Sequence, residues 1–271
     1  MFKILYVCSL KADLYRDQRF IEEFRQFPDV ELIVCKGSAL MNICKLKKLL
    51  PEADAVITMY GNKQIKEFMK AQTVKSFNKV EPSFIANNKW ATYQKLSAAN
   101  IPQPKTSLQP IFDFPYICKA NFGSLGNDIK LITSMENSAP VEVAHIFQEY
   151  IAESAGTSAR VIMVNKKPVA WYALRNDKNF RSNFAKGGVG HKCELTPEME
   201  DLCIRTAECL DLDYCGIDLL HSNRGWLVLE VNSKAGLEGI ETFTGLNIAK
   251  HFAEYVVETL RLEKAMEKTN D

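Results

Sequence analysis

The segment Cys215–Asn232 (CGIDLLHSNRGWLVLEVN) constrains the fold more than any other part of the chain. Two apolar runs flank Asn223-Arg224-Gly225, and a three-residue hairpin loop is a type I turn followed by a left-handed residue, the place that Gly225 takes. The spacing therefore predicts an antiparallel hairpin in which Ser222 lies opposite Trp226. Its strands are expected to bury four aliphatic residues on one face: Ile217, Leu219, Leu227 and Leu229.

This register also brings two carboxylates together. It places Asp218 opposite Glu230, and Asn232 shares the face of Glu230 because strand side chains alternate with a period of two. Two facing carboxylates repel each other unless a cation or a proton lies between them. Magnesium suits such oxygen ligands, because it keeps some waters and binds substrate phosphates as well. The hairpin thus indicates a magnesium site, and a solvated, charged face of a sheet is the alternative.

A lysine and a glycine-rich loop upstream indicate a phosphate site. Lys119 follows the apolar Ile117 and Cys118 on a predicted strand, and burying it is costly unless it meets an anion. The loop Gly123-Ser124-Leu125-Gly126 comes next, and glycines let backbone N–H groups approach phosphate oxygens closely. An ordinary hairpin turn has the same composition. Neither GxxxxGKS/T nor GxGxxG occurs, so the sequence supports neither a P-loop nor a dinucleotide-binding fold.

Two further segments fit a nucleotide. Lys89 lies in the first turn of a helix that we expect to begin there, capped by Asn87 or Asn88. The helix dipole disfavours a cation at this end and favours an anion, so a bound anion would explain the lysine, and a surface position is the alternative. The run Phe147–Ile151 ends a strand with a polar pair; it either presents backbone groups to an adenine edge or is simply a strand end.

The order of predicted elements divides the chain. The first third alternates short apolar strands, such as Phe2–Cys8, with helices, such as Arg16–Phe27, which indicates a small open sheet flanked by helices. The pattern changes near Glu81–Asn88, after which strands predominate. Helices are still expected over Pro197–Leu210 and Asn247–Leu260, and a polar tail follows the second of them.

Composition excludes several classes of protein. The 34 basic and 33 acidic residues nearly cancel, so nothing global points to a nucleic-acid partner. No apolar run approaches the roughly 20 residues that span a bilayer, and the N-terminus lacks the apolar core of a signal peptide. The eight cysteines form no CxxC pair. We therefore expect a cytoplasmic protein with free thiols and with neither a nucleic-acid nor a membrane partner.

Three ordered motifs carry a resemblance to a known family. They are NKWATYQKLSAANIPQPKT (Asn88–Thr106), NFRSNFAKGG (Asn179–Gly188) and LEVNSKAGLEGIETFTGLNIAK (Leu229–Lys250). Together they resemble the ATP-grasp superfamily, and more closely its RimK-like branch, which includes ligases that add glutamate to the C-terminus of a small-subunit ribosomal protein. The similarity covers nearly the whole chain.

The resemblance implies a fold and a division into domains. It implies an α/β protein, with α+β catalytic lobes: an ATP-grasp fold preceded by a small open-sheet α/β domain. Residues 1–84 would form the preceding domain, residues 85–150 the central nucleotide-binding lobe and residues 151–271 the catalytic lobe. ATP would lie between the two lobes, and the first domain would help to wall the substrate site.

The resemblance also implies roles for individual residues. ATP would be contacted by Lys89, Lys119, Gly123, Ser124, Gly126, Glu149, Tyr150, Ile151 and Ser158. One or two magnesium ions, or manganese in their place, would be held by Asp218, Glu230 and Asn232. The reacting groups would be faced by Arg181, Asn183 and Arg175.

Two positions depart from the family pattern. Ser158 stands where the family usually has an acidic residue that contacts the ribose. The relatives commonly read Asn-x-Ser-Pro-Gly after the metal-binding glutamate, whereas this chain has Asn232-Ser233-Lys234-Ala235-Gly236. We expect Lys234 to change which acceptor is tolerated.

The implied reaction forms an amide. A substrate carboxylate attacks the γ-phosphate of ATP, and an amine then displaces phosphate from the acyl phosphate. Arg160, Arg175, Arg181 and Lys186 provide more positive charge than ATP and two metal ions require. Since arginine binds carboxylates through two parallel hydrogen bonds, we expect an acidic amino acid, with glutamate first, and a peptide or protein C-terminus as its acceptor. The alternative is that Arg160 and Arg175 only face solvent or bridge to backbone.

Other functions stay open at this point. A different ATP-grasp ligase would join or cyclise other amino acids or peptides, or act on an amino-group carrier protein. A nucleotide-binding protein without catalysis is a further alternative, against which the set Lys119, Asp218, Glu230 and Asn232 argues. A homo-oligomer is compatible with the sequence, which does not decide it.

Overall fold

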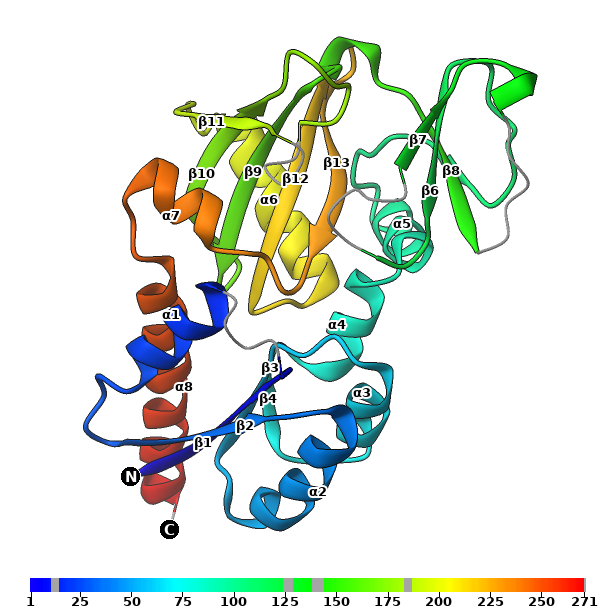
Figure 1. Cartoon of the computed structure of the whole chain (residues 1–271). Helices are drawn as coiled ribbons and strands as arrows, with labels where there is room; N and C mark the ends of the chain where they lie inside the picture. The colour runs from blue at the N-terminus through cyan, green and yellow to red at the C-terminus, as the bar shows by residue number, and fades with distance from the viewer. Residues whose placement is uncertain (11–14, 124–128, 138–143, 183–186, 271) are drawn as a thin grey trace.

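The computed structural model describes residues 1–10, 15–123, 129–137, 144–182 and 187–270. Within these ranges the strands form three sheets, which Figure 1 shows as a lower N-terminal sheet, an upper five-stranded sheet and a smaller sheet beside the upper one. No helix in the described ranges combines the length and the apolar character that a membrane crossing requires.

The N-terminal sheet is parallel and is covered on both faces. Its strands pair in the order β2 (Val30–Lys36), β1 (Phe2–Cys8), β3 (Ala55–Thr58) and β4 (Lys75–Phe77). One face packs on α2 (Ala39–Leu49) and α3 (Lys63–Lys70), and the other packs on α1 (Tyr15–Phe24) and α8 (Ile248–Asn270). The continuous apolar run of β1 is explained by this double coverage, as in other parallel sheets.

The closing helix is longer than the sequence pattern predicted. We expected it to end at Leu260, but α8 continues to Asn270. Beyond Leu260 the helix gains ion pairs with the N-terminal sheet, where Arg261 binds Asp29 at 2.7 Å and Lys75 contacts Glu263. The polar tail is also rich in lysine and glutamate, which favour helix.

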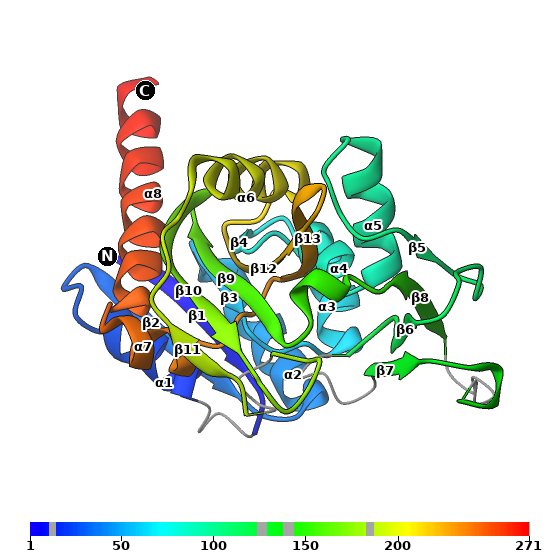
Figure 2. The same cartoon turned by 90° about the horizontal axis from the view of Figure 1, so that it is seen from above.

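The central sheet is small and antiparallel. Its strands lie in the order β5 (Thr106–Ser107), β8 (His145–Glu149), β6 (Tyr116–Ala120) and β7 (Ile129–Ile132). Two helices, α4 (Val80–Ala86) and α5 (Lys89–Ala98), connect it to the N-terminal sheet. The Asn88 side chain accepts a hydrogen bond from the backbone N–H of Ala91, so the predicted cap of α5 is confirmed. Seen from above in Figure 2, α5 and these strands lie to one side of β13.

The upper sheet carries the predicted hairpin. Its antiparallel strands lie in the order β11 (Val189–His191), β10 (Lys167–Arg175), β9 (Thr157–Val164), β12 (Tyr214–Ser222) and β13 (Gly225–Asn232). Helix α6 (Pro197–Leu210), capped by the side chain of Thr196, covers one face. The short helix α7 (Glu238–Thr244) leads from β13 to α8.

The hairpin contains the predicted carboxylate pair, but its strands are paired in a different register near the turn. Gly225 has the expected left-handed backbone, with φ of 89°. However, Trp226 pairs with His221 instead of Ser222, so the register near the turn is one residue off. A bulge at Leu229 then adds one residue to β13 and restores the pair Asp218–Glu230.

The bulge also changes which side chains face the core. The sequence pattern placed Leu227 and Leu229 with Ile217 and Leu219, but the structure packs Val228 and Val231 with them against α6. Leu229 instead shares the opposite, pocket-lining side with Glu230, because an extra residue in a strand shifts the alternation.

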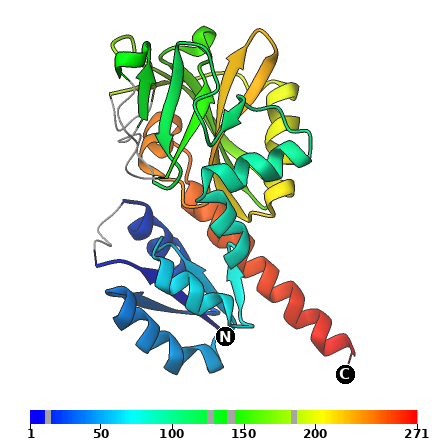
Figure 3. The same ribbon diagram turned by 90° about the vertical axis from the view of Figure 1, so that its right-hand side faces the viewer.

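One apolar core connects the N-terminal and upper sheets. Phe20 of α1, Tyr214 of β12 and Phe252 of α8 form a cluster of rings with centroids 5.1–5.4 Å apart. Figure 3 shows α8 running from the upper part of the molecule down past the N-terminal sheet. The division into domains at residues 84 and 150 stays a prediction. Helix α8, which belongs to the predicted catalytic lobe, packs on the N-terminal sheet.

Asn78, after β4, connects the same two sheets through polar contacts. Its buried amide nitrogen donates to the carbonyl oxygens of Tyr214 (2.6 Å) and Ser233 (3.0 Å). Its oxygen accepts from the N–H groups of Asp213 (2.6 Å) and Tyr214 (2.7 Å). The N-terminal sheet is thereby held against both strands of the carboxylate hairpin.

We expect Asn78→Ala to lower the free energy of unfolding by about 3 kcal/mol, because it leaves buried backbone groups of β12 without partners. Urea unfolding measures the change. Asn87→Ala is the matched control, since Asn87 is only half-buried and donates to Ser83 of its own helix, and it should cost about 1 kcal/mol or less. Equal losses in the two variants would contradict the role of Asn78.

Candidate active site

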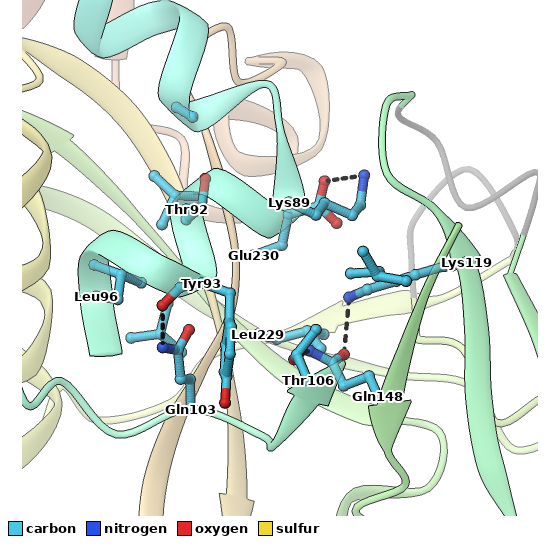
Figure 4. Close-up of a pocket in the computed structure, with 14 residues that line it drawn as sticks. Lys89, Thr92, Tyr93, Leu96, Gln103, Thr106, Lys119, Gln148, Leu229 and Glu230 are labelled. Atoms are coloured by element: carbon cyan, nitrogen blue, oxygen red, sulfur yellow. Dashed lines mark hydrogen bonds and ion pairs between the residues drawn. The ribbon is translucent and has the colours of Figure 1, made fainter. Parts of the chain in front are cut away.

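A pocket of about 750 Å³ lies between the central and upper sheets. Eight residues predicted from the sequence line it: Lys119, Glu149, Tyr150, Ile151, Ser158, Arg181, Asp218 and Glu230. A second space of about 350 Å³, shown in Figure 4, reaches Lys89 and shares Lys119 and Glu230 with the first.

Lys119 is a buried cation at the centre of this region. Its Nζ donates to Oε1 of Gln148 at 2.8 Å, and Gln148 is held in turn by Thr106 at 3.0 Å (Figure 4). Burial lowers the pKa of Lys119 to about 8, although the carboxylate of Glu230 opposes the shift. An ammonium that has lost most of its water is prepared to bind an anion.

Lys89 connects α5 to the carboxylate hairpin. Its Nζ donates to the carbonyl oxygen of Gly123 at 2.8 Å and lies 3.6 Å from Oε1 of Glu230. An anionic side chain thus lies near this lysine (Figure 4), and the bound anion expected at the start of α5 stays a prediction. Gly123 has φ of 123°, a backbone conformation that side chains other than glycine rarely adopt.

Asp218 is held by an arginine on the neighbouring strand. Arg160 of β9 lies opposite Asp218 and donates to both of its carboxylate oxygens, at 2.6 and 2.7 Å. Burial alone would lower the pKa of Arg160, but the carboxylate outweighs burial and raises it. The alternative that Arg160 faces solvent or bridges to backbone is therefore wrong.

The carboxylate pair fits a magnesium ion by its chemistry. Asp218 and Glu230 lie side by side, and Asn232 lies two positions further along β13, where its Oδ1 accepts from the N–H of Lys234 at 3.0 Å. The described residues contain no cluster of three or more His, Cys, Asp and Glu side chains. Two carboxylates and an amide leave coordination positions for water and phosphate, which is how magnesium is usually bound.

Two hydroxyls occupy the place expected for an acidic ribose contact. Ser158 of β9 and Ser182 both line the pocket, and their Oγ atoms are 2.6 Å apart. Hydroxyls both donate and accept hydrogen bonds, so this pair suits the hydroxyls of a sugar without adding charge.

The segment after β8 forms another wall of the pocket. The carboxylate of Glu149 accepts from Arg224 at 2.8 Å and from the N–H of Lys105 at 3.1 Å. The ring of Tyr150 meets Phe180 edge to face, with centroids 6.4 Å apart, and Ile151 is buried. Since the Glu149 side chain is already bound within the protein, the contribution of this segment is an apolar wall and its backbone.

The structure does not bring every predicted residue to the pocket. Leu174 of β10 lines it, so the next residue, Arg175, points to the other face and pairs with Asp177 at 2.7 Å in solvent. The geometry gives no support to a catalytic role for Arg175. Arg181 does line the pocket, with its guanidinium 5.5 Å from the centroid of the Phe180 ring. Ser124, Gly126, Asn183 and Lys186 lie outside the described residues.

Several lining residues were not predicted as site residues. Among them are Gln148, Ser182 and Leu229, and Arg160 is bound to the lining residue Asp218. Gln148 had a usable signal, because it is a polar residue inside an apolar strand. Arg160 was named from the sequence as one of four cations for a substrate carboxylate, but no local signal pointed to Asp218 as its partner, which is 58 positions away in the sequence.

We expect Arg160→Gln to lower the free energy of unfolding by about 3 kcal/mol, because it leaves Asp218 as a half-paired charge in the sheet. Magnesium with an ATP analogue should recover more stability in the variant than in the wild type, since the metal no longer competes with Arg160 for the carboxylate. Chemical unfolding with and without these ligands measures both effects.

Arg205→Gln is the control, because Arg205 forms an exposed pair with Asp201 within α6 and should cost about 0.5 kcal/mol or less. If Arg160→Gln were no more destabilising than this control, the pair would not be what holds Asp218.

Comparison with known proteins identifies the family. Residues 86–256 match the model of the RimK-like ATP-grasp domain. A probable alpha-L-glutamate ligase of Histophilus somni (strain 2336) is 32% identical over 225 residues, which cover 74% of this chain and 75% of that protein.

Solved structures share the fold. D-alanine–D-alanine ligase from Bacillus anthracis complexed with ATP superimposes with a TM-score of 0.70 at 16% identity, covering 98% of this chain and all of that one. The ATP-grasp ligase PsnB, complexed with a phosphomimetic variant of a minimal precursor, Mg and ADP, gives 0.67 at 15% identity, covering 95% and 98%. The chain belongs to the RimK-like ATP-grasp family and is a carbon–nitrogen ligase that uses ATP.

Proposed function

We propose that this ligase adds glutamate to the C-terminus of a peptide or protein through an acyl phosphate, releasing ADP and phosphate. One observation carries the catalytic part of the proposal: buried Lys119 and the pair Asp218–Glu230 line the same pocket from opposite sheets. Cations on one side of the pocket would bind the phosphates of a nucleoside triphosphate. Carboxylates on the other side would hold a metal ion against the same phosphates.

ATP would occupy the larger pocket. Lys119 and Lys89 would contact its phosphates, together with the backbone of the loop that begins at Gly123. The segment Glu149–Ile151 would flank the adenine, and Ser158 with Ser182 would contact the ribose. The lining supports this placement, since it combines apolar residues such as Ile151 with charged residues such as Lys119 and Glu230.

Asp218, Glu230 and Asn232 would hold one or two magnesium ions. Bound magnesium would offset the charge that develops on the phosphate oxygens during transfer. Arg160 would keep Asp218 oriented through both of its carboxylate oxygens. Arg181, which lines the pocket, would face the reacting carboxylate and the transferred phosphate.

The chemistry would need no side-chain nucleophile. The substrate carboxylate oxygen attacks the γ-phosphorus, and the bond to the β-phosphate oxygen of ADP breaks. The amine nitrogen then attacks the acyl carbon, loses a proton and displaces phosphate. Positioning and charge neutralisation by the pocket would account for the rate, as in other phosphoryl transfers.

The substrates are proposed from the relatives more than from the pocket. The Histophilus somni relative is named an alpha-L-glutamate ligase, and PsnB was solved with a precursor. Two of the four cations from which the sequence predicted an acidic substrate no longer support that prediction. Arg160 is bound to Asp218, and Arg175 points away from the pocket. Of the other two, Arg181 lines the pocket, and Lys186 lies outside the described residues.

The test is a competition of the twenty amino acids with peptides that end in glutamate or in other residues. We expect glutamate to be incorporated first, as detected by mass spectrometry, and ADP to appear in step with amide bonds. Glu230→Gln, which removes the charge and keeps the shape, should abolish turnover. Preference for a neutral or basic amino acid would refute the substrate, and AMP as the main nucleotide product would refute the acyl-phosphate route.

The pKa of Lys119 predicts how nucleotide binding depends on pH. The ammonium form binds phosphate, so above a pKa of about 8 the free protein must take up a proton to bind. The dissociation constant of a non-hydrolysable ATP analogue should therefore rise by up to tenfold per pH unit above pH 8. Calorimetric titration from pH 7.5 to 9.5 measures this slope.

Lys119→Met keeps the length of the side chain and removes the charge. It should bind the analogue about ten- to a hundredfold more weakly at pH 7.5. Its dissociation constant should also stay flat across the same pH range. A variant that keeps the slope of the wild type would show that another group titrates.

A further inference from the structure

A group of buried cations lies outside the nucleotide pocket, where the upper sheet meets the N-terminal sheet. Lys234 belongs to the turn between β13 and α7, two residues after Asn232. The residue as a whole is half-buried, but its Nζ is buried and has no hydrogen-bond partner among the described residues. A buried ammonium without a partner is costly in a native protein and calls for an explanation.

Two further cations lie around Lys234. Arg16 of α1 donates to the Lys234 carbonyl oxygen at 2.7 Å, and Lys66 of α3 is buried with its Nζ 3.1 Å from the carbonyl oxygen of Ser83. The positive charges of Lys66 and Arg16 both act on the ammonium of Lys234, whose Nζ is itself buried. These neighbours therefore repel the ammonium of Lys234 and do not compensate it.

The nearby carboxylate is already used. Oδ1 of buried Asp17 accepts from Arg16 at 2.8 Å and from the hydroxyl of Tyr6 at 2.9 Å. Among the described residues of this group there are thus three cations, Lys234, Lys66 and Arg16. The one carboxylate described beside them, Asp17, is bound to Arg16. The group carries surplus positive charge in a place with little water.

Unpaired hydroxyls lie in the same part of the fold. Ser233 Oγ and Thr58 Oγ1 are buried without a partner in the described residues. Thr58 ends β3 and precedes Met59, whose carbonyl oxygen accepts from Arg16 at 3.4 Å. This edge holds the carboxyl ends of the parallel strands, which is where open parallel sheets usually bind ligands.

We propose that Lys234, supported by Lys66 and Arg16, binds a carboxylate of one of the two substrates and thereby selects it. This assignment rests on the proposed function, because Lys234 lies in the turn that follows β13, the strand of the proposed metal ligands Glu230 and Asn232. A carboxylate would supply the missing acceptor for the ammonium of Lys234. The carboxylate belongs either to the incoming amino acid or to the acceptor, and the experiment separates the two.

The test compares Lys234→Met with the wild type by calorimetry, in the presence of magnesium and a non-hydrolysable ATP analogue. The probes are L-glutamate, the dipeptide Glu-Glu, and the same dipeptide with its C-terminus amidated. We expect one carboxylate probe to bind ten- to a hundredfold more weakly to the variant, and the ATP analogue to bind equally well to both proteins. Loss for L-glutamate assigns the incoming amino acid, and loss for Glu-Glu but not for its amide assigns the acceptor terminus.

Thermal melting without ligand gives a second readout. Replacing an unpaired buried charge by an apolar side chain of similar length should raise the melting temperature of Lys234→Met by several degrees. Lys70→Met is the matched control, because Lys70 lies on α3 one turn after Lys66 but is exposed and paired with Glu81. It should change neither carboxylate affinity nor melting temperature.

Equal affinity of Lys234→Met and wild type for every probe overturns the proposal, and so does a wild type that binds none of them. A lower melting temperature with unchanged affinities gives Lys234 a structural role and also overturns it. Lys234-dependent binding in a protein that forms no amide would keep this site and refute the proposed function. Amide formation by a Lys234→Met variant with unchanged affinities would refute this site and keep the proposed function.

Discussion

The pair between Arg160 and Asp218 is the interaction on which the site depends. It joins β9 to β12 in the middle of the upper sheet and holds both carboxylate oxygens of Asp218. Two neighbouring carboxylates repel each other unless a cation offsets their charge. Arg160 provides that cation, and the bulge at Leu229 brings Glu230 opposite Asp218. The two carboxylates can therefore lie side by side on one face of the sheet without destabilising it.

The opposite charges lie on separate parts of the fold. Lys89 begins α5 and Lys119 belongs to β6, whereas Asp218 and Glu230 belong to the upper sheet. The 3.6 Å contact between Lys89 and Glu230 spans the gap between them. Because the two sheets are joined by such contacts rather than by a continuous apolar core, a pocket lined by charge remains between them, and a polyanion with a metal ion can enter it.

The N-terminal sheet is fixed to this arrangement from below. The aromatic cluster around Phe252 and the hydrogen bonds of Asn78 hold it against β12 and β13. The carboxyl ends of its strands consequently lie next to the end of β13, where Arg16 donates to the carbonyl oxygens of both Met59 and Lys234. This proximity places the cations around Lys234 beside the strand that carries Glu230.

Local chemistry in the sequence determined β1, the Asn88 cap of α5 and the left-handed turn at Gly225, because periodicity, capping and turn geometry act over a few residues. The pairing of Asp218 with Glu230 was also predicted, although the predicted register omitted the bulge. Only the tertiary structure decided the partner of Arg160, the exposure of Arg175, the face of Leu229 and the isolation of Lys234. Each of these depends on contacts between strands and helices that are far apart in the sequence. Such contacts result from packing the whole core, so no local sequence pattern predicts them.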